Sequence, residues 1–405
     1  MEASHRPTSL ELDIAMLLDS PDGKKYTDLH INSNGIVRGR IGANRWENVH
    51  AIDGKKYVVR ASDVNEFLEA IFRSQEDPLS EPGAKKSWRQ RLSQERSLHP
   101  SMYIGNIDSV TGVETMQRVR ITVQRQSTGS DIGMMIRALR PLPKTPEELG
   151  LPLAIDTFAG SNSGLILVVG PTGAGKTTTI ASVLQGINNT RDGHIVTIED
   201  PIEYVIEPSR CIVNQREIGI DVASFHDGVK DALRFVPDVI MIGEIRDAET
   251  MLAGVRAAES GHLVIASLHA PSTVQGVRKC LGYLSSPAEQ LSFANSLVGI
   301  LAQQLVIGRS GQKHLVFETL NGRSVEVQRS ISNVMTDASG KSLDSLEQKL
   351  RNKDLISEFC LPMKMCVDAL IAEGKITRDV GGAALYNPDD VRAILRQNDA
   401  HVQLG

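Results

Sequence analysis

A glycine-rich stretch, GPTGAGKTT at residues 170–178, carries the strongest chemical signal in the sequence. It fits the pattern G-x-x-x-x-G-K-[ST], in which glycines let backbone N–H groups close around a phosphate that a lysine neutralises. The stretch follows the apolar run GLILVV and opens a helical pattern, which is the context that the pattern requires. We therefore predict a site for a nucleoside triphosphate, rather than an incidental turn. Its predicted residues are Gly170, Pro171, Thr172, Gly173, Ala174, Gly175, Lys176, Thr177 and Thr178.

Carboxylates follow the next apolar run, HIVTIE. Glu199 ends this run and Asp200 comes directly after it. Ligands of open parallel sheets bind beyond the carboxyl ends of the strands, so we expect both carboxylates beside the phosphate loop. Oxygen ligands suit Mg²⁺, and we predict that Thr177, Glu199 and Asp200 hold this ion, partly through water. A turn held by local hydrogen bonds is the alternative for the two acids.

Glu244 ends another apolar run, DVIMIGE, and is the predicted catalytic base. A carboxylate at that position can take a proton from the water that attacks the γ phosphate. A structural salt bridge with Arg246 is the competing interpretation. His262 and His269 flank the run LVIASL, whose strand would separate them by about 23 Å, so only one of them can face the site. We predict that His269 senses the γ phosphate. His262 is predicted to have a structural role, either capping a helix or packing in the core.

Arginines are frequent in the N-terminal part of the chain, and an arginine lent by a neighbouring subunit is a common way to stabilise charge on the γ phosphate. Arg118 and Arg120 alternate along RVRITVQ and so share one strand face. Solvated surface arginines are the alternative for this group. The candidates are Arg118, Arg120, Arg125, Arg137 and Arg140.

The motifs together resemble the Walker A, Asp box, Walker B and His box of the secretion-superfamily ATPases, which are hexameric motors of type II secretion, type IV pili and type IV secretion. The segments that carry the resemblance are GPTGAGKT, TIEDPIEY, PDVIMIGEIRDAET and SGHLVIASLHA, within about 155–310, while TDLHINSNG and RVRITV resemble the N-terminal domain of the PilT-like branch. The resemblance implies a homohexamer that binds ATP and Mg²⁺ between subunits. It implies catalytic roles for Glu199, Glu244, His269, Arg120 and Arg137, with Arg140 as a substitute for Arg137.

The sequence departs from two branches of this family, which narrows the set of members that it resembles. Cys280 stands alone where type II secretion and pilus-extension members carry a tetracysteine zinc module, and ISEFCLPMKMCVDALIAEGKITRD does not match the C-terminal segment of retraction ATPases. The resemblance thus favours ATPases of Dot/Icm type IVB secretion and conjugative-plasmid transfer, with inner-membrane components as partners. Pilus retraction and a DNA translocase are the alternatives. The basic, aromatic run AKKSWRQR would suit a translocase, but the formal charge of −5 gives no general reason for stable nucleic-acid binding.

The pattern of strands and helices that must position these residues predicts an α/β fold. Short apolar runs alternate with helical patterns from residue 163, which predicts a RecA-like domain with parallel strands in GLILVV, HIVTIE, CIVNQ, DVIMIG and LVIASLH. The predicted organisation is an α+β, PAS-like N-terminal domain (1–142), a linker (143–153), the ATPase domain (154–340) and a helical C-terminal region (341–405). Residues 74–99 are interpreted as a polar surface excursion. Four separated cysteines and the lack of a long apolar run predict a soluble, cytoplasmic protein.

Overall fold

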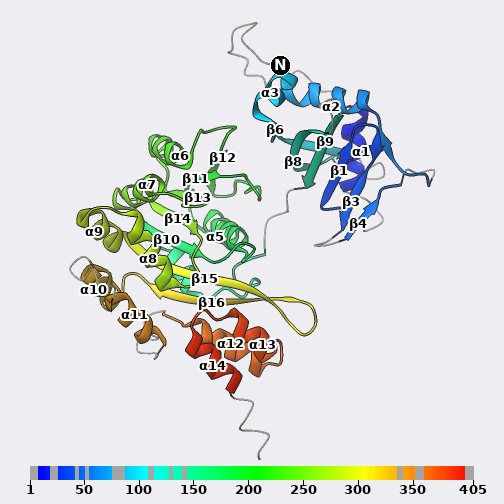
Figure 1. The fold of residues 1–405 in the computed structure, drawn as a ribbon. Helices are drawn as coiled ribbons and strands as arrows, with labels where there is room; N and C mark the ends of the chain where they lie inside the picture. The colour runs from blue at the N-terminus through cyan, green and yellow to red at the C-terminus, as the bar shows by residue number, and fades with distance from the viewer. Residues whose placement is uncertain are drawn as a thin grey trace, which may run out of the picture. The chain divides into compact units, whose positions relative to one another are not determined.

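The chain divides into two compact units, Met1–Arg140 and Pro141–Gly405, in the computed structural model (Figure 1). The structure describes residues 8–18, 26–41, 45–50, 54–74, 87–107, 114–126, 131–138, 144–334, 341–351 and 360–396. Each unit has its own hydrophobic core, so each is described by itself.

The N-terminal unit is an antiparallel sheet covered by helices. The sheet runs in the order β4-β3-β1-β9-β8-β6, with β7 also paired to β8, and a separate ribbon joins β2 to β5. The strands are β1 (Asp28–Asn32), β2 (Gly35–Ile36), β3 (Arg38–Ile41), β4 (Arg45–Asn48), β5 (Val58–Val59), β6 (Ser97–Leu98), β7 (Ser101–Ile107), β8 (Glu114–Gln126) and β9 (Asp131–Ala138). The helices are α1 (Ser9–Leu18), α2 (Ala61–Ser74) and α3 (Trp88–Glu95).

One face of this sheet is buried and the other carries polar side chains, because alternate residues of a strand point to opposite faces. Leu29, Ile31 and Ile121 are fully buried in the same cluster as Phe67 and Ile71 of α2. In the sequence, Val64, Phe67, Leu68 and Ile71 recur at helical spacing, which predicts one apolar helix face, and all four are fully buried. The unit is α+β, as the sequence predicted.

The prediction that residues 74–99 form a surface excursion is wrong for the part that the structure describes. Ser87 and Gln90 form a capping box that starts α3, and this helix buries Trp88 and Leu92 in the N-terminal core. The abundance of charged residues hid this short amphipathic helix, in which two large apolar side chains four residues apart share a face. Residues 75–86 lie outside the described residues.

The C-terminal unit is built on a mostly parallel sheet in the order β12-β11-β13-β14-β10-β15-β16. All neighbours are parallel except β15 and β16. The five strands named from the sequence are present, and β15 and β16 extend the sheet beyond them. The strands are β10 (Gly164–Val169), β11 (Gly193–Glu199), β12 (Cys211–Glu217), β13 (Val239–Ile242), β14 (Leu263–Leu268), β15 (Leu297–Ile307) and β16 (Lys313–Asn321).

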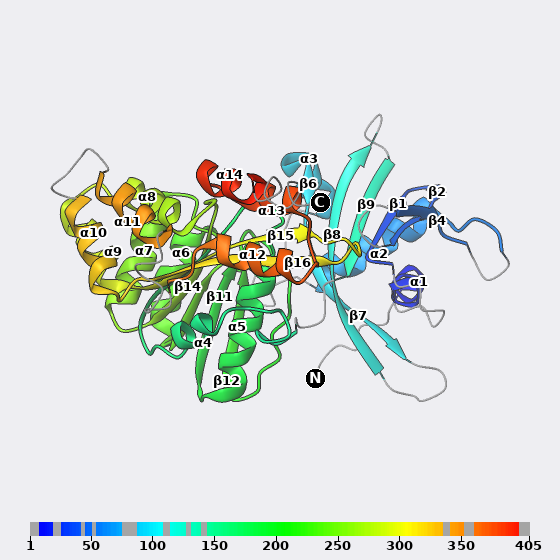
Figure 2. The same cartoon turned by 90° about the horizontal axis from the view of Figure 1, so that it is seen from below.

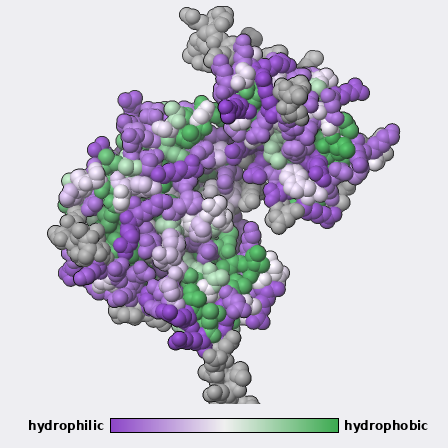
Figure 3. Space-filling model, viewed as in Figure 1, coloured by the Kyte–Doolittle hydropathy of each residue, from purple (hydrophilic) through white to green (hydrophobic). Residues whose placement is uncertain are grey.

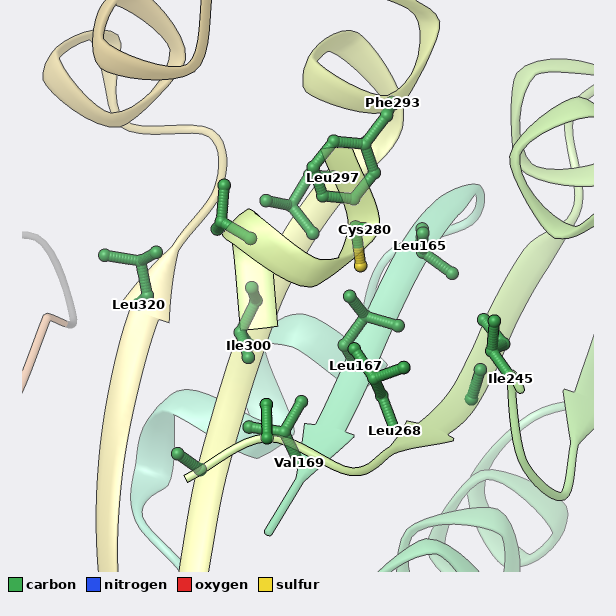
Figure 4. Packing of buried hydrophobic residues seen from close by; sticks show 14 of the residues in the cluster. Leu165, Leu167, Val169, Ile245, Leu268, Cys280, Phe293, Leu297, Ile300 and Leu320 are labelled. Atoms are coloured by element: carbon green, nitrogen blue, oxygen red, sulfur yellow. The ribbon is translucent and has the colours of Figure 1, made fainter. Parts of the chain in front are cut away.

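Helices cover both faces of this sheet, as Figure 2 shows. Leu165, Leu167 and Val169 of β10 point to one face, where Cys280 and Phe293 pack (Figure 4). The intervening residues of β10 join the cluster on the other face, against α4 and α5. The helices are α4 (Leu153–Ala159), α5 (Lys176–Thr190), α6 (Phe225–Ala232), the 3₁₀ turn η1 (Leu233–Phe235), α7 (Ala248–Glu259), α8 (Thr273–Tyr283) and α9 (Pro287–Ser296).

The described residues beyond 340 form short helices, as the sequence predicted for this region. One of them, α11, is part of the core, because Leu343, Leu346 and Leu350 are buried in the main cluster of the C-terminal unit. None of the described helices is long and apolar enough to cross a membrane, and the face of the molecule in Figure 3 is mainly hydrophilic. The helices are α10 (Val325–Val334), α11 (Lys341–Arg351), α12 (Met363–Ala372), α13 (Arg378–Ala384) and α14 (Pro388–Arg396).

Candidate active site

The glycine-rich loop connects β10 to the first turn of α5, so its backbone N–H groups and the helix N-terminus converge at one point. Gly173 and Gly175 have φ of +79° and +86°, a region that side chains with a Cβ rarely adopt. A Cβ on Gly170 would lie 2.4 Å from the carbonyl oxygen of Gln303. The glycines therefore serve both the bend of the loop and its close approach to β15.

Gln303 supports the loop and was missed by the sequence analysis. Its side-chain amide donates a 2.7 Å hydrogen bond to the carbonyl of Ala174, and the residue is 1% exposed. The signal in the sequence is weak: a glutamine within the apolar run LAQQLVI, on a strand that was not predicted. Only the pairing of β15 with β10 shows that this side chain meets the phosphate loop.

Lys176 lies over its own loop. Its Nζ donates to the carbonyl oxygens of Gly170 at 2.9 Å and Pro171 at 3.1 Å. Burial lowers the pKa of this ammonium group, and the neighbouring cation Lys279 lowers it further, whereas Glu244 opposes the shift. A bound anion would offset the cost of this desolvation and raise the pKa again, because an opposite charge favours the protonated form.

A cleft of about 400 Å³ opens beside the loop. It contains the acids and the histidine that the sequence placed at the carboxyl ends of neighbouring strands. The lining residues are Thr172, Gly173, Lys176, Thr177, Glu199, Asp200, Pro201, Glu203, Phe225, Met241, Gly243, Glu244, Arg246, Ser267 and His269. The tertiary structure thus brings together the predicted phosphate loop, both predicted metal-binding acids, the predicted base and His269.

Glu244 lies at the centre of the polar contacts in this cleft. Its Oε1 is 2.9 Å from Nε2 of His269, and its Oε2 is 2.7 Å from Nε of Arg246. The salt bridge that we considered as the competing interpretation is therefore present, and Glu244 also faces the cleft. The Glu244 side chain is 16% exposed, so water can reach a carboxylate that is otherwise held in place.

His269 can orient Glu244 without carrying a charge. Burial lowers the pKa of His269, as do the nearby cations led by Lys176, although Glu244 pulls in the opposite direction. A neutral imidazole can bond to a carboxylate oxygen only from a protonated Nε2. His262 instead bonds through Nδ1 to the carbonyl of Ala257 at 3.0 Å, which corresponds to the first of the two roles, capping or packing, that the sequence left open for it.

Glu199 is buried and bonds to side chains of its own strand β11 and of the neighbouring strand β12. Its Oε1 accepts hydrogen bonds from Thr197 Oγ1 at 2.7 Å and from Gln215 Nε2 at 2.9 Å. Burial raises the pKa of the carboxyl to about 7, against the effect of these hydrogen bonds. The local hydrogen bonds that we considered as the alternative for Glu199 are present. Its carboxyl group is nevertheless part of the cleft wall.

The oxygen donors of the cleft fit Mg²⁺. The Thr177 hydroxyl and the carboxylates of Glu199, Asp200 and Glu203 line the same space. Within the part of the chain that the structure describes, no three histidine, cysteine or acidic side chains form a metal cage by themselves. Mg²⁺ rarely uses such a cage, because it retains waters and binds one or two carboxylates together with substrate phosphates. The three predicted ligands, Thr177, Glu199 and Asp200, thus line one cleft, although one oxygen of Glu199 is engaged by Thr197 and Gln215.

Arg118, Arg120 and Arg137 lie on the polar face of the N-terminal sheet. Arg125 instead shares the strand face of the buried Ile121 and Val123 and donates a 3.3 Å hydrogen bond to the carbonyl of Arg89 in α3. Arg120 of β8 and Arg137 of β9 are directly opposed residues of the antiparallel pair. Arg137 Nε lies 2.6 Å from Oδ1 of Asp28, whose side chain is only 4% exposed. Arg140 falls outside the described residues.

A glycine loop between a buried parallel strand and a helix, with acids at the ends of the adjacent strands, defines a P-loop ATPase. The chain belongs to the family of type II/IV secretion system proteins, whose family model matches residues 148–380. This membership bears out the family that the sequence motifs indicated.

Known relatives agree with this assignment. The type IV pilus retractation ATPase PilT of Pseudomonas aeruginosa is 33% identical over 272 residues, which cover 66% of this chain and 75% of that protein. A crystal structure of the pilus retraction motor PilT with bound ADP covers 95% of this chain and 99% of that chain, with a TM-score of 0.73 and 29% identity. The Legionella pneumophila ATPase DotB shares the fold, with a TM-score of 0.66 over 94% of this chain and 96% of that chain, at 22% identity.

Proposed function

We propose that this ATPase hydrolyses Mg·ATP as a homohexameric ring and drives a type IVB secretion or conjugative transfer apparatus from the cytoplasmic side of the inner membrane. The observation that carries the proposal is the meeting of Lys176 and Thr177 with the Glu244–His269 pair in one cleft. Membership of the secretion family supports the coupling to such an apparatus.

The residues of the cleft divide the work of hydrolysis. Lys176 leaves the carbonyls of its loop and binds the β and γ phosphates. Mg²⁺, held by Thr177 and Asp200, would neutralise charge on the phosphates. Glu244 takes a proton from the attacking water, whose oxygen forms a bond to the γ phosphorus as the bond to the leaving ADP oxygen breaks. His269 keeps the Glu244 carboxylate oriented while remaining uncharged.

Arg120 and Arg137 are proposed to complete the site of a neighbouring copy. Each is an arginine of the N-terminal unit, and a guanidinium that reaches the γ phosphate in trans stabilises the charge that develops there. Phosphate release would then change how one copy docks on the next, with a rigid-body movement as the output. In this proposal residues 1–142 and 154–340 are the moving domains, 143–153 is the linker, and 341–405 form the C-terminal region.

Pilus retraction is the second candidate, and the likeness to PilT favours it. A deletion strain separates the two candidates. Loss of plasmid or effector transfer with normal twitching motility supports the secretion or conjugation motor. Loss of twitching with normal transfer supports the retraction motor.

A DNA translocase has less support. Trp88, the aromatic residue of the basic run at 84–91, is 3% exposed and donates its ring N–H to Glu69 at 3.0 Å. It is therefore unable to stack on a nucleotide base without unfolding α3. This conclusion would be reversed if DNA increased the rate of ATP hydrolysis and if that increase became smaller as the salt concentration rose.

The central experiment combines phosphate release with sizing of the protein with and without ATP. The proposal requires multiple turnover, an assembled species of six copies, and a rate per copy that rises as the protein assembles. A diluted monomer that hydrolyses ATP as fast as the assembled species would contradict the shared site.

A further inference from the structure

Arg246 bridges the two carboxylates that Mg²⁺ and catalysis would need. Its Nη1 lies 3.1 Å from Oδ2 of Asp200 and its Nε lies 2.7 Å from Oε2 of Glu244. The two acids come from different strands, so the guanidinium ties the carboxyl end of β11 to that of β13. With His269 on the other oxygen of Glu244, both oxygens of that carboxylate are engaged.

The strand register makes this bridge possible. Ile198 and Ile242 are paired residues of the parallel strands β11 and β13. Asp200 and Glu244 each follow two residues later, so the two carboxylates leave the sheet at the same level. Arg246 follows Glu244 by two residues, and its side chain folds back to lie between the two carboxylates. The planar guanidinium, with donors in a fixed fork, suits two acceptors on different residues.

The backbone and the side chain of Arg246 differ in how firmly they are held. The Tyr283 hydroxyl donates a 3.0 Å hydrogen bond to the Arg246 carbonyl, which anchors the main chain. The Arg246 side chain is 55% exposed, and the Asp200 side chain is 42% exposed. Ion pairs with this much solvent are weak and exchange readily. The guanidinium can therefore leave the acids while its backbone stays in place.

We propose that Arg246 is a cationic placeholder, which occupies the space between Asp200 and Glu244 until Mg·nucleotide displaces it. A guanidinium and a hydrated divalent cation cannot share the same carboxylate oxygens. Arg246 therefore prevents a metal ion from settling in the nucleotide-free cleft, where it would lock Asp200 and Glu244. Displacement by Mg·nucleotide frees the second oxygen of Glu244 to accept the proton of the attacking water. This inference rests on the metal role proposed for Asp200.

The test measures metal binding without nucleotide, using Mn²⁺ as a paramagnetic probe in place of Mg²⁺. Arg246→Gln is expected to bind Mn²⁺ about tenfold more tightly than the wild type, because two partly exposed ion pairs no longer compete. Arg256→Gln is the matched control, since it removes the same charge from an exposed position on the next helix. Arg246→Lys keeps the charge without the fork and is expected to fall between wild type and Arg246→Gln.

The gain must also depend on Asp200. In the double variant Arg246→Gln with Asp200→Asn, Mn²⁺ binding is expected to return to the wild-type level or below it. The placeholder proposal would be overturned if Arg246→Gln and Arg256→Gln bound Mn²⁺ equally well. It would also be overturned if the tighter Mn²⁺ binding of Arg246→Gln persisted in the variant that lacks Asp200. If Arg246→Gln does not fold, as judged by its thermal melt, the Arg246→Lys comparison decides the question. No ATP is present, so this result is independent of whether the protein turns over as a ring.

Discussion

Arg120 and Arg137 stand directly opposite each other on β8 and β9, so two like charges face each other across the strand pair. Such a pair destabilises a sheet by comparison with a neutral one. Asp28 compensates Arg137 through a 2.6 Å ion pair, whereas Arg120 has no ion pair within the described part of the chain. The stability of the sheet does not explain this pair, which is consistent with the proposed role at a phosphate.

Arg120→Gln and Lys176→Ala are predicted to be inactive alone and active when mixed. Each variant lacks one half of the shared site, but a Lys176→Ala copy can lend its arginines to the intact cleft of an Arg120→Gln neighbour. Loss of the arginine should lower turnover by about 10³-fold or more while ATP binding persists. The measurement is phosphate release from the mixture. A mixture as inactive as its components, although the two variants assemble together, would contradict supply of Arg120 in trans.

Lys176→Ala is expected to lose nucleotide binding, because no other residue of the loop carries a compensating positive charge. Calorimetric titration with ADP measures this directly. Lys230→Ala, on the exposed side of α6, removes a lysine away from the cleft and serves as the control. If Lys176→Ala bound ADP as tightly as the wild type, the phosphate loop would not be the nucleotide-binding site.

Glu244→Gln is expected to bind ATP and hydrolyse it about 10²- to 10⁴-fold more slowly, the usual range for loss of a general base. The amide retains the size of the side chain but has little affinity for a proton. Single-turnover kinetics separates this chemical defect from slow product release. Turnover equal to that of the wild type would show that the base lies elsewhere.

Glu199→Gln is predicted to change how stability depends on pH. Burial raises the folded-state pKa of Glu199 from 4.5 to about 7. Between these values the folded protein holds a proton that the unfolded chain has released, so the wild type loses stability as pH rises across this window. The full loss is at most roughly 3 to 4 kcal/mol, because the two pKa values differ by about 2.5 and each pKa unit corresponds to about 1.36 kcal/mol.

The amide that Glu199→Gln introduces does not titrate, so the variant should become more stable relative to the wild type between about pH 5 and pH 8. The expected change in the difference between the two melting temperatures is on the order of 5 °C. Thermal melts of both proteins without nucleotide provide the measurement. Curves that shift in parallel over this range would show that Glu199 titrates as an ordinary carboxyl group.

The sequence alone determined the phosphate loop, because its chemistry depends on neighbouring residues of one short segment. Gly170 to Thr178 supply the turn, the lysine and the hydroxyl without help from distant parts of the chain. The same holds for the acids and His269 at strand ends, since the alternation of strands and helices places the carboxyl ends of parallel strands at one edge. Local spacing also predicted the helix at 61–74 and the shared face of Arg118 and Arg120.

Only the tertiary structure decided which of these groups touch. The support of Ala174 by Gln303 depends on the pairing of β15 with β10, over a separation of 129 residues. The bridge from Arg246 to Asp200 depends on the register of β11 with β13, and the burial of Trp88 depends on the packing of α3 on its sheet. Contacts of this kind arise from strand order and desolvation, which are properties of the whole fold and are not encoded in any one segment.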